Sequence, residues 1–289
     1  MRSDRYEAHR GRVRLDHDGR AARWDGLSAH TKEKTMKILM MMTGSPYLTL
    51  NDGSKHRPSG VWGEEFAVPY GRFKERGYDV DAATVGGVVP TFDSSSLDPS
   101  GAKWVRPKGT RVDDAAKCKE WASTIEAASE WKKPLAVEKI TREQVNAYDG
   151  IFHAGGHGCM EDEAQSEEMS RVNMWAFELY KPVAAVCHGH CGMLKMRDAQ
   201  GNWPYRGYRM TSFAHDEERM TQLYGKIPFI LEEELRRLGG EYSKAAMTWD
   251  SYVVEDRNLI TGQNPYSSLL VAETFLRKLG DSRAKAQAS

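Results

Sequence analysis

Hydrophobic residues along the chain alternate between two spacings, and this alternation predicts a repeated strand–helix unit. The run at 37–43 (KILMMMT) is apolar on both faces, which is typical of a central strand in a covered sheet. Residues 61–77 then place large apolar side chains at helical spacing and end at Gly77, and 78–85 returns to strand-like alternation. This β-α-β order predicts a parallel sheet with right-handed crossovers.

The same alternation continues towards the C-terminus. Further helices are predicted at 114–131, 141–146, 169–179, 227–238 and 265–279. Further strands are predicted at 148–154, 183–186, 206–213 (a strand or hairpin), 247–254 and 259–261. We therefore expect one doubly wound α/β domain at 36–280, a mostly parallel sheet with helices on both faces. Residues 1–35 lack periodicity and are expected to form a partly disordered N-terminal extension, and 281–289 a C-terminal tail.

One predicted strand ends in a cysteine. The short, uncharged segment 183–186 leads directly into Cys187-His188-Gly189. This position is the sharp strand-to-helix turn called a nucleophile elbow, where helix amide groups favour the thiolate, the nucleophilic form of cysteine. A buried core cysteine is the alternative. Glycines at 189 and 192, with a second glycine cluster upstream, favour a reactive site.

That second cluster is Gly155-Gly156-His157-Gly158, which follows the strand predicted at 148–154. Ligands of open α/β sheets bind beyond the carboxyl ends of the strands, so this loop and the cysteine turn share one edge. Glycines there let backbone amides approach a substrate oxygen and form an oxyanion hole. Alone the glycines would indicate only a tight turn, but together with the elbow they indicate a functional loop.

A histidine beside a nucleophile needs a carboxylate to orient it. Asp216, Glu217 and Glu218 follow the elbow, but spacing does not choose among them, and a surface acidic run would need no functional explanation. Glu65, next to Glu64 at the start of an apolar helix, would hydrogen-bond Cys187 if it faces inward. The alternative is that both glutamates stabilise the helix dipole.

Composition narrows the function further. The 41 basic and 41 acidic residues balance, which gives no indication of a nucleic-acid or membrane partner. No apolar run approaches the roughly 20 residues that cross a bilayer, and the N-terminus has no signal-peptide core. Four cysteines, at 118, 159, 187 and 191, form neither a disulfide framework nor a recognised metal-ligand spacing. A cytoplasmic protein without cofactor or metal is expected.

Together these motifs resemble the ThiJ/PfpI superfamily, which has a class I glutamine amidotransferase-like fold. More narrowly they resemble the branch that contains glutathione-independent glyoxalase III enzymes and related heat-shock chaperones. The resemblance covers about 38–279 and includes further matching segments: 59–61 with Glu65 and Pro69, 93–99, 211–213 with Glu218, and 259–265.

The resemblance implies a flavodoxin-like sandwich, usually a homodimer, with Cys187 as nucleophile. His188 would be the general base, oriented by Glu218, while Glu65 hydrogen-bonds the cysteine and the amides of Gly156 and His188 form the oxyanion hole. The implied reaction is that of a lyase of the D-lactate dehydratase type. The thiolate attacks the aldehyde of methylglyoxal to give a hemithioacetal, a proton moves between carbons through an enediol, and hydrolysis releases lactate without metal or glutathione.

One position departs from the family, which commonly has proline after Cys-His-Gly where this chain has His190. We expect His190 and Cys191 to alter substrate choice or to supply a resolving thiol, and we count His157 and His190 as candidate pocket residues. Two other functions stay open. One is a stress-related holding chaperone or oxidant sensor, in which Cys187 is oxidised reversibly. The other is an amidase, peptidase or hydratase on the same fold.

Overall fold

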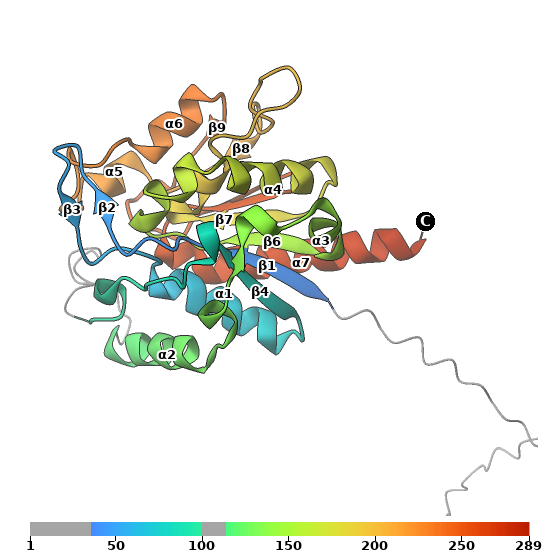
Figure 1. Cartoon of the computed structure of the whole chain (residues 1–289), viewed down its shortest axis with the longest axis horizontal. Coiled ribbons are helices and arrows are strands. Elements are labelled where there is room, and N and C mark those ends of the chain that lie inside the picture. The colour runs from blue at the N-terminus through green and yellow to red at the C-terminus, as the bar shows by residue number, and fades with distance from the viewer. Residues whose placement is uncertain (1–35, 100–113, 289) are drawn as a thin grey trace, which may run out of the picture. The chain divides into compact units, whose positions relative to one another are not determined.

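The structure is a computed structural model that describes residues 36–99 and 114–288 (Figure 1). The predicted extension at 1–35 lies outside the described residues. The described part belongs to one compact unit, Thr35–Ser289.

A seven-stranded sheet forms the centre of this unit, in the order β10-β11-β7-β6-β1-β4-β5. Every neighbouring pair is parallel except β10 and β11, which are antiparallel. The mostly parallel α/β class predicted from the sequence is therefore confirmed. The strands are β1 (Lys37–Met41), β4 (Asp79–Thr84), β5 (Leu135–Ala136), β6 (Gly150–His153), β7 (Val183–Val186), β10 (Val253–Asp256) and β11 (Leu259–Gly262).

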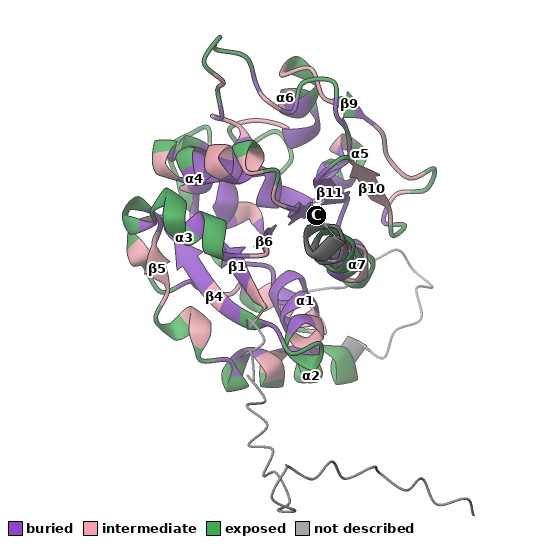
Figure 2. Cartoon of the chain, turned by 90° about the vertical axis from the view of Figure 1, so that its right-hand side faces the viewer, coloured by how far each residue is buried: buried purple, intermediate pink, exposed green. Residues whose placement is uncertain are grey.

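Helices cover both faces of the sheet, as Figure 1 shows. One face packs against α1 (Gly63–Glu75), α2 (Asp114–Ala127) and α7 (Ser268–Ala288), and the other against α3 (Arg142–Ala147), α4 (Glu167–Glu178) and α6 (Leu231–Arg237). After Lys37, strand β1 is apolar because its side chains enter the cores on both faces of the sheet. Ile38 and Met40 enter the first core, whereas Leu39 and Met41 enter the second. Figure 2 shows the strands buried between helices whose outer sides are exposed.

Local sequence signals explain several helix ends. The predicted capping box at the start of α3 is present: the Thr141 hydroxyl accepts from the Gln144 amide, and the Gln144 side chain accepts from the Thr141 amide. Helix α6 begins at Leu231, later than predicted, because the residue before Pro228 is disfavoured in helical conformation. Helix α7 continues to Ala288, beyond its predicted end at Leu279 and through most of the expected tail.

Two predicted strands after the elbow are shorter than, or shifted from, their predicted ranges. Of the two alternatives for 206–213, the strand is confirmed over β8 (Arg209–Met210), which pairs in parallel with β9 (Glu241–Tyr242) and so does not form a hairpin, whose strands would be antiparallel. Strand β10 starts only at Val253, because Trp249 has a positive φ of 71° that a strand does not accommodate. A short hairpin of β2 (Leu48–Thr49) and β3 (Lys55–His56) was not predicted.

Candidate active site

The site lies at the carboxyl edge of the three adjacent strands β6, β7 and β11. Cys187 follows β7 directly and has a φ of 57°, a left-handed conformation that turns the chain sharply out of the sheet. The predicted elbow is therefore present. The segment after it, η8 (Cys187–Met193), is a 3₁₀ helix.

Cys187 is 4% exposed, and its thiol sulfur lies 3.3 Å from Nδ1 of His188. Burial raises the pKa of this thiol well above its usual value, the Glu65 carboxyl adds to the rise, and the backbone amide of His188 only partly opposes it. The expectation of a resting thiolate is therefore wrong for this site. Attack by Cys187 requires a base that removes the thiol proton.

His188 is the side chain placed to act as that base. Its second ring nitrogen, Nε2, donates to Oε2 of Glu218 at 3.0 Å, which leaves Nδ1 facing the sulfur. Burial, with the neighbouring ring of His157, lowers the pKa of His188. A neutral imidazole accepts a proton, so this arrangement suits general-base chemistry.

The structure distinguishes the three consecutive acids. Asp216 is exposed and pairs with Lys244. Glu217 is buried and accepts hydrogen bonds from the Trp249 amide (2.9 Å), the Gln263 and Asn264 side chains (2.8 and 2.7 Å) and the Ala214 amide (3.1 Å). Of the three, Glu218 contacts His188. The three acids occupy successive positions of the short helix α5 (His215–Glu218), so their side chains point in different directions.

Glu65 reaches the site from the first turn of α1. It is fully buried, and its Oε2 lies so close to Gly155 that a Cβ added there would be 2.5 Å away. Burial raises its pKa well above the usual range, with Cys187 among the groups that partly lower it. Neither carboxyl oxygen has a hydrogen bond of standard geometry to any described residue. A protonated Glu65 beside the thiol is the arrangement that these surroundings favour.

The glycine loop is shaped by close backbone contacts. Gly156 has a φ of 125°, and a Cβ there would lie 2.1 Å from the carbonyl oxygen of Gly60, so the position excludes other residues. Gly156 lines the cavity beside Cys187. The His188 amide lies next to the sulfur, where it lowers the pKa of the thiol. The loop and the elbow therefore meet at one cavity.

This cavity is small and largely apolar. Its volume is about 20 Å³, enough for on the order of one or two water molecules. Its walls are Trp62, Gly156, His157, Cys187, Phe213, Thr221, Trp249 and Pro265. The sequence reasoning missed Trp62, Thr221, Trp249 and Pro265 as lining residues. Only Pro265, at the end of a family-like segment, carried a signal.

The structure separates the two predicted pocket histidines. His157 lines the cavity and its Nε2 lies 2.9 Å from Oε1 of Glu218. His190 is fully buried outside the cavity lining, with Nδ1 3.1 Å from the carbonyl oxygen of Cys187. Cys191 belongs to the core on the opposite face of the sheet from Cys187, which does not suit a resolving thiol.

Ring nitrogens of His157 and His188 and a carboxylate oxygen of Glu218 lie within 4.8 Å of one another, and among the described residues this is the one such group with the spacing of metal ligands. The two contacts that hold them are hydrogen bonds of ordinary length. We therefore interpret the group as acid–base machinery.

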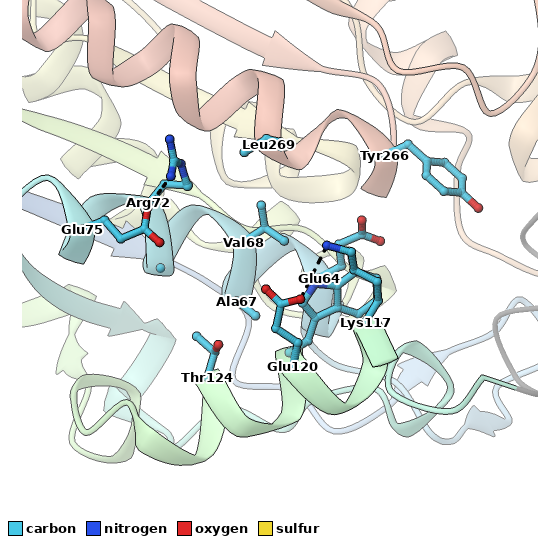
Figure 3. Close-up of a pocket in the computed structure, with 12 residues that line it drawn as sticks. Glu64, Ala67, Val68, Arg72, Glu75, Lys117, Glu120, Thr124, Tyr266 and Leu269 are labelled. Atoms are coloured by element: carbon cyan, nitrogen blue, oxygen red, sulfur yellow. Dashed lines mark hydrogen bonds and ion pairs between the residues drawn. The ribbon is translucent and has the colours of Figure 1, made fainter. Parts of the chain in front are cut away.

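A larger cavity of about 450 Å³ lies between α1, α2 and α7 (Figure 3). Its walls carry charged side chains that bond to one another: Arg72 pairs with Glu75, and Lys117 with Glu120 at 3.5 Å. None of its lining residues is a cysteine or histidine. The smaller cavity at Cys187 is therefore the candidate active site.

A flavodoxin-like sheet with cysteine, histidine and glutamate at its carboxyl edge defines a class of α/β proteins built around a nucleophile elbow. Residues 59–278 match the DJ-1/PfpI family, and the chain belongs to this family. The superfamily predicted from the sequence is confirmed.

Several known proteins are similar over most of the chain. Glyoxalase 3 of Candida albicans is 25% identical over 247 residues, which cover 83% of this chain and 97% of that protein. Protein/nucleic acid deglycase HchA of Staphylococcus aureus is 25% identical over 242 residues, 82% of this chain and 77% of the relative. The crystal structure of glyoxalase III from Candida albicans superposes with a TM-score of 0.65 at 21% identity, covering 84% and 97% of the chains, and shows the same fold. No described helix has both the length and the apolar character needed to traverse a bilayer.

Proposed function

We propose that this protein is a cysteine-dependent, glutathione-independent glyoxalase that converts small 2-oxoaldehydes such as methylglyoxal to 2-hydroxy acids. The observation that carries this proposal is the unbroken series of contacts from Cys187 Sγ through His188 to Glu218 beside a small cavity. The names of two relatives, a glyoxalase and a deglycase, support chemistry on 2-oxoaldehydes or their adducts.

In the first step His188 takes the thiol proton at Nδ1 as the sulfur attacks the aldehyde carbon. Glu218 stays ionised and stabilises the resulting imidazolium. The carbonyl oxygen, now the oxygen of a hemithioacetal, lies near the amides of Gly156 and His188.

In the second step a proton moves from the former aldehyde carbon to the oxygen of the neighbouring ketone, which converts the hemithioacetal to an enediol. Protonation of the neighbouring carbon then gives a lactoyl thioester on Cys187. Water hydrolyses this thioester, which releases lactate and restores the thiol. The neutral carboxyl of Glu65 beside the sulfur stabilises each thiolate that forms, because it donates a hydrogen bond.

The cavity favours a small substrate. The side chains of Trp62, Phe213 and Trp249 surround the thiol and leave an apolar space that suits the methyl end of a three-carbon aldehyde. Removal of such aldehydes from protein or nucleic acid, as the name of the Staphylococcus aureus relative describes, is the second candidate. The small volume favours the free aldehyde.

The test compares free methylglyoxal with a methylglyoxal-modified peptide, both without glutathione. The proposal predicts lactate from the free aldehyde at a kcat/KM well above that for the peptide adduct. Preferred turnover of the adduct would support the second candidate. A wild-type protein that forms no lactate from either, with Cys187 still open to alkylation, would overturn both and leave chaperone or hydrolase functions to examine.

A further inference from the structure

One carboxylate in the site is shared by two histidines. Oε1 of Glu218 lies 2.9 Å from Nε2 of His157, and Oε2 lies 3.0 Å from Nε2 of His188. The two imidazole rings are 4.3 Å apart, centroid to centroid, and Thr221 also donates to Oε1 at 3.1 Å. A base oriented by a carboxylate needs one histidine, so the second ring is unexplained by the steps above.

Both rings adjoin the same cavity, because His157 lines it and His188 contacts the cavity-lining residue Cys187. Nδ1 of His188 faces the Cys187 sulfur. His157 lines the cavity, and no hydrogen bond joins its Nδ1 to any other residue in the described ranges. The hydrogen-bonded group formed by His157, Glu218 and His188 therefore runs from the cavity wall to the Cys187 thiol.

The three ionisable side chains of this group have pKa values that are shifted in different directions. Burial opposes ionisation of Glu218, but both histidines outweigh it and hold the pKa of the carboxyl well below its usual range. Burial likewise opposes protonation of His157, but Glu218 overcomes it and raises the pKa of that ring, whereas burial and His157 lower the pKa of His188. Asp93 also raises the pKa of His157, and His157 in turn lowers the pKa of His56 on β3 through the repulsion between the two imidazoles. The pKa of His157 is therefore the higher of the two, and a proton that binds to this pair of rings binds to His157 before His188.

We propose that His157 is a second acid–base residue of the site, which protonates the substrate oxygen at its Nδ1 while His188 accepts the thiol proton. This inference rests on the proposed glyoxalase function. The positive charge passes from one ring to the other, and Glu218 stays ionised between them.

The step balances without any co-reactant. The bond between sulfur and the aldehyde carbon forms, and the electron pair of the carbonyl π bond moves to oxygen. That oxygen takes the Nδ1 proton of His157, while the thiol proton moves to Nδ1 of His188. When the enediol later becomes the thioester, His157 accepts the hydroxyl proton and His188 supplies a proton to carbon, which returns the charge to His157.

The variant that tests this role is His157→Gln. A glutamine side-chain amide can still donate to Glu218, but it does not titrate and cannot protonate the substrate. We expect kcat/KM for methylglyoxal to fall by about 10²-fold, within the usual range for one acid–base group. The fall in activity at alkaline pH that accompanies deprotonation of His157 should also disappear. His56→Gln is the matched control, because it removes a neighbouring imidazole that does not contact Glu218.

A second measurement separates proton transfer from positioning. Alkylation of Cys187 by iodoacetamide needs the thiolate but no protonated oxygen, so it should proceed in His157→Gln no more slowly than in the wild type. Unchanged kcat/KM and an unchanged pH profile in the variant would overturn the inference, and so would alkylation slowed as much as turnover. Failure of the proposed function would appear differently, as a wild type that makes no lactate, and would remove the inference with it.

Discussion

The two sides of the Cys187 turn carry the same kinds of residues in different arrangements. The front cluster consists of Cys187, His188, Glu218 and Glu65, with Cys187 in the core that packs against α1 and α7. The back cluster consists of Cys191, Cys159, His153 and Glu163, with both cysteines in the core that packs against α4. Each cluster therefore combines a cysteine of the segment 187–191 with an imidazole and a buried carboxyl.

The clusters differ in how their members are connected. In the front cluster the imidazole joins the thiol to a carboxylate, and the thiol opens to a cavity. In the back cluster His153 bonds instead to the Asn173 amide oxygen at 2.9 Å, and neither oxygen of Glu163 has a hydrogen-bond partner among the described residues. Burial raises the pKa of Glu163 and Cys191 and lowers that of His153 to about 4. Composition alone thus does not make a site; connection to a carboxylate and access to a cavity do.

Substitution of Cys187 and of Cys191 should give the largest difference in activity between the two clusters. Cys187→Ser should reduce lactate formation by more than about 10³-fold, since it removes the nucleophile. Cys191→Ala should keep activity within about threefold and lower the free energy of unfolding by on the order of 1 kcal/mol, because it removes only packing. Lactate assays and urea unfolding of both variants measure this. Equal loss of activity in the two variants would contradict the assignment of catalysis to the front cluster alone.

The neighbouring acids Glu218 and Glu217 give the next contrast. Glu218→Gln should lower kcat by roughly 10³-fold even under conditions where the variant is fully folded, because the neutral amide no longer stabilises the imidazolium. Glu217→Gln should instead lower the free energy of unfolding by about 2–4 kcal/mol, since a carboxylate that accepts four hydrogen bonds is lost. Activity measured below each unfolding transition distinguishes them, and a Glu217→Gln that is stable but inactive would contradict the assignment.

The buried histidine of the back cluster should appear in the pH dependence of stability. The folded pKa of His153 is about 4, below the unfolded value of about 6.5. Its contribution is fully present above the unfolded pKa and is lost as pH falls through the folded pKa. Stability should therefore fall by on the order of 3 kcal/mol from pH 7 to pH 4 through this group alone. His153→Gln should flatten that slope in urea unfolding; an unchanged slope would show that His153 is not a buried neutral ring.

The two buried glutamates give the smallest contrast. Glu65→Gln should lower kcat about tenfold, because the amide is a weaker proton donor to the sulfur than the carboxyl. Glu163→Gln should leave kcat unchanged and alter stability by less than about 1 kcal/mol, since glutamine resembles the protonated acid. Steady-state kinetics and unfolding at pH 7 test both. A large loss of stability in Glu163→Gln would indicate that Glu163 is ionised.

The sequence could predict features that depend on neighbours along the chain. Apolar runs at 37–43 and 183–186 identified two central strands, and the abrupt change to Cys187-His188-Gly189 identified the elbow. The capping box at Thr141 could also be predicted from the sequence. The positive φ of Trp249 could not be predicted, because the position is not a glycine.

Features that depend on burial or distant contacts could not be predicted in the same way. The helix-terminus argument favoured a thiolate, but complete burial beside Glu65 has the larger effect on Cys187. The choice of Glu218 over Glu217 requires the direction in which each side chain leaves α5. The back cluster had no sequence signal, because Glu163 lies in an ordinary polar segment.

The central claim is that Cys187 forms a covalent bond with a 2-oxoaldehyde, and mass spectrometry of protein quenched during turnover of methylglyoxal tests it most directly. We expect a mass increase of one methylglyoxal, mapped by peptide analysis to Cys187 and absent from Cys187→Ser, with Cys191 unmodified. Lactate formation without any adduct on Cys187, or with the adduct on another residue, would contradict it.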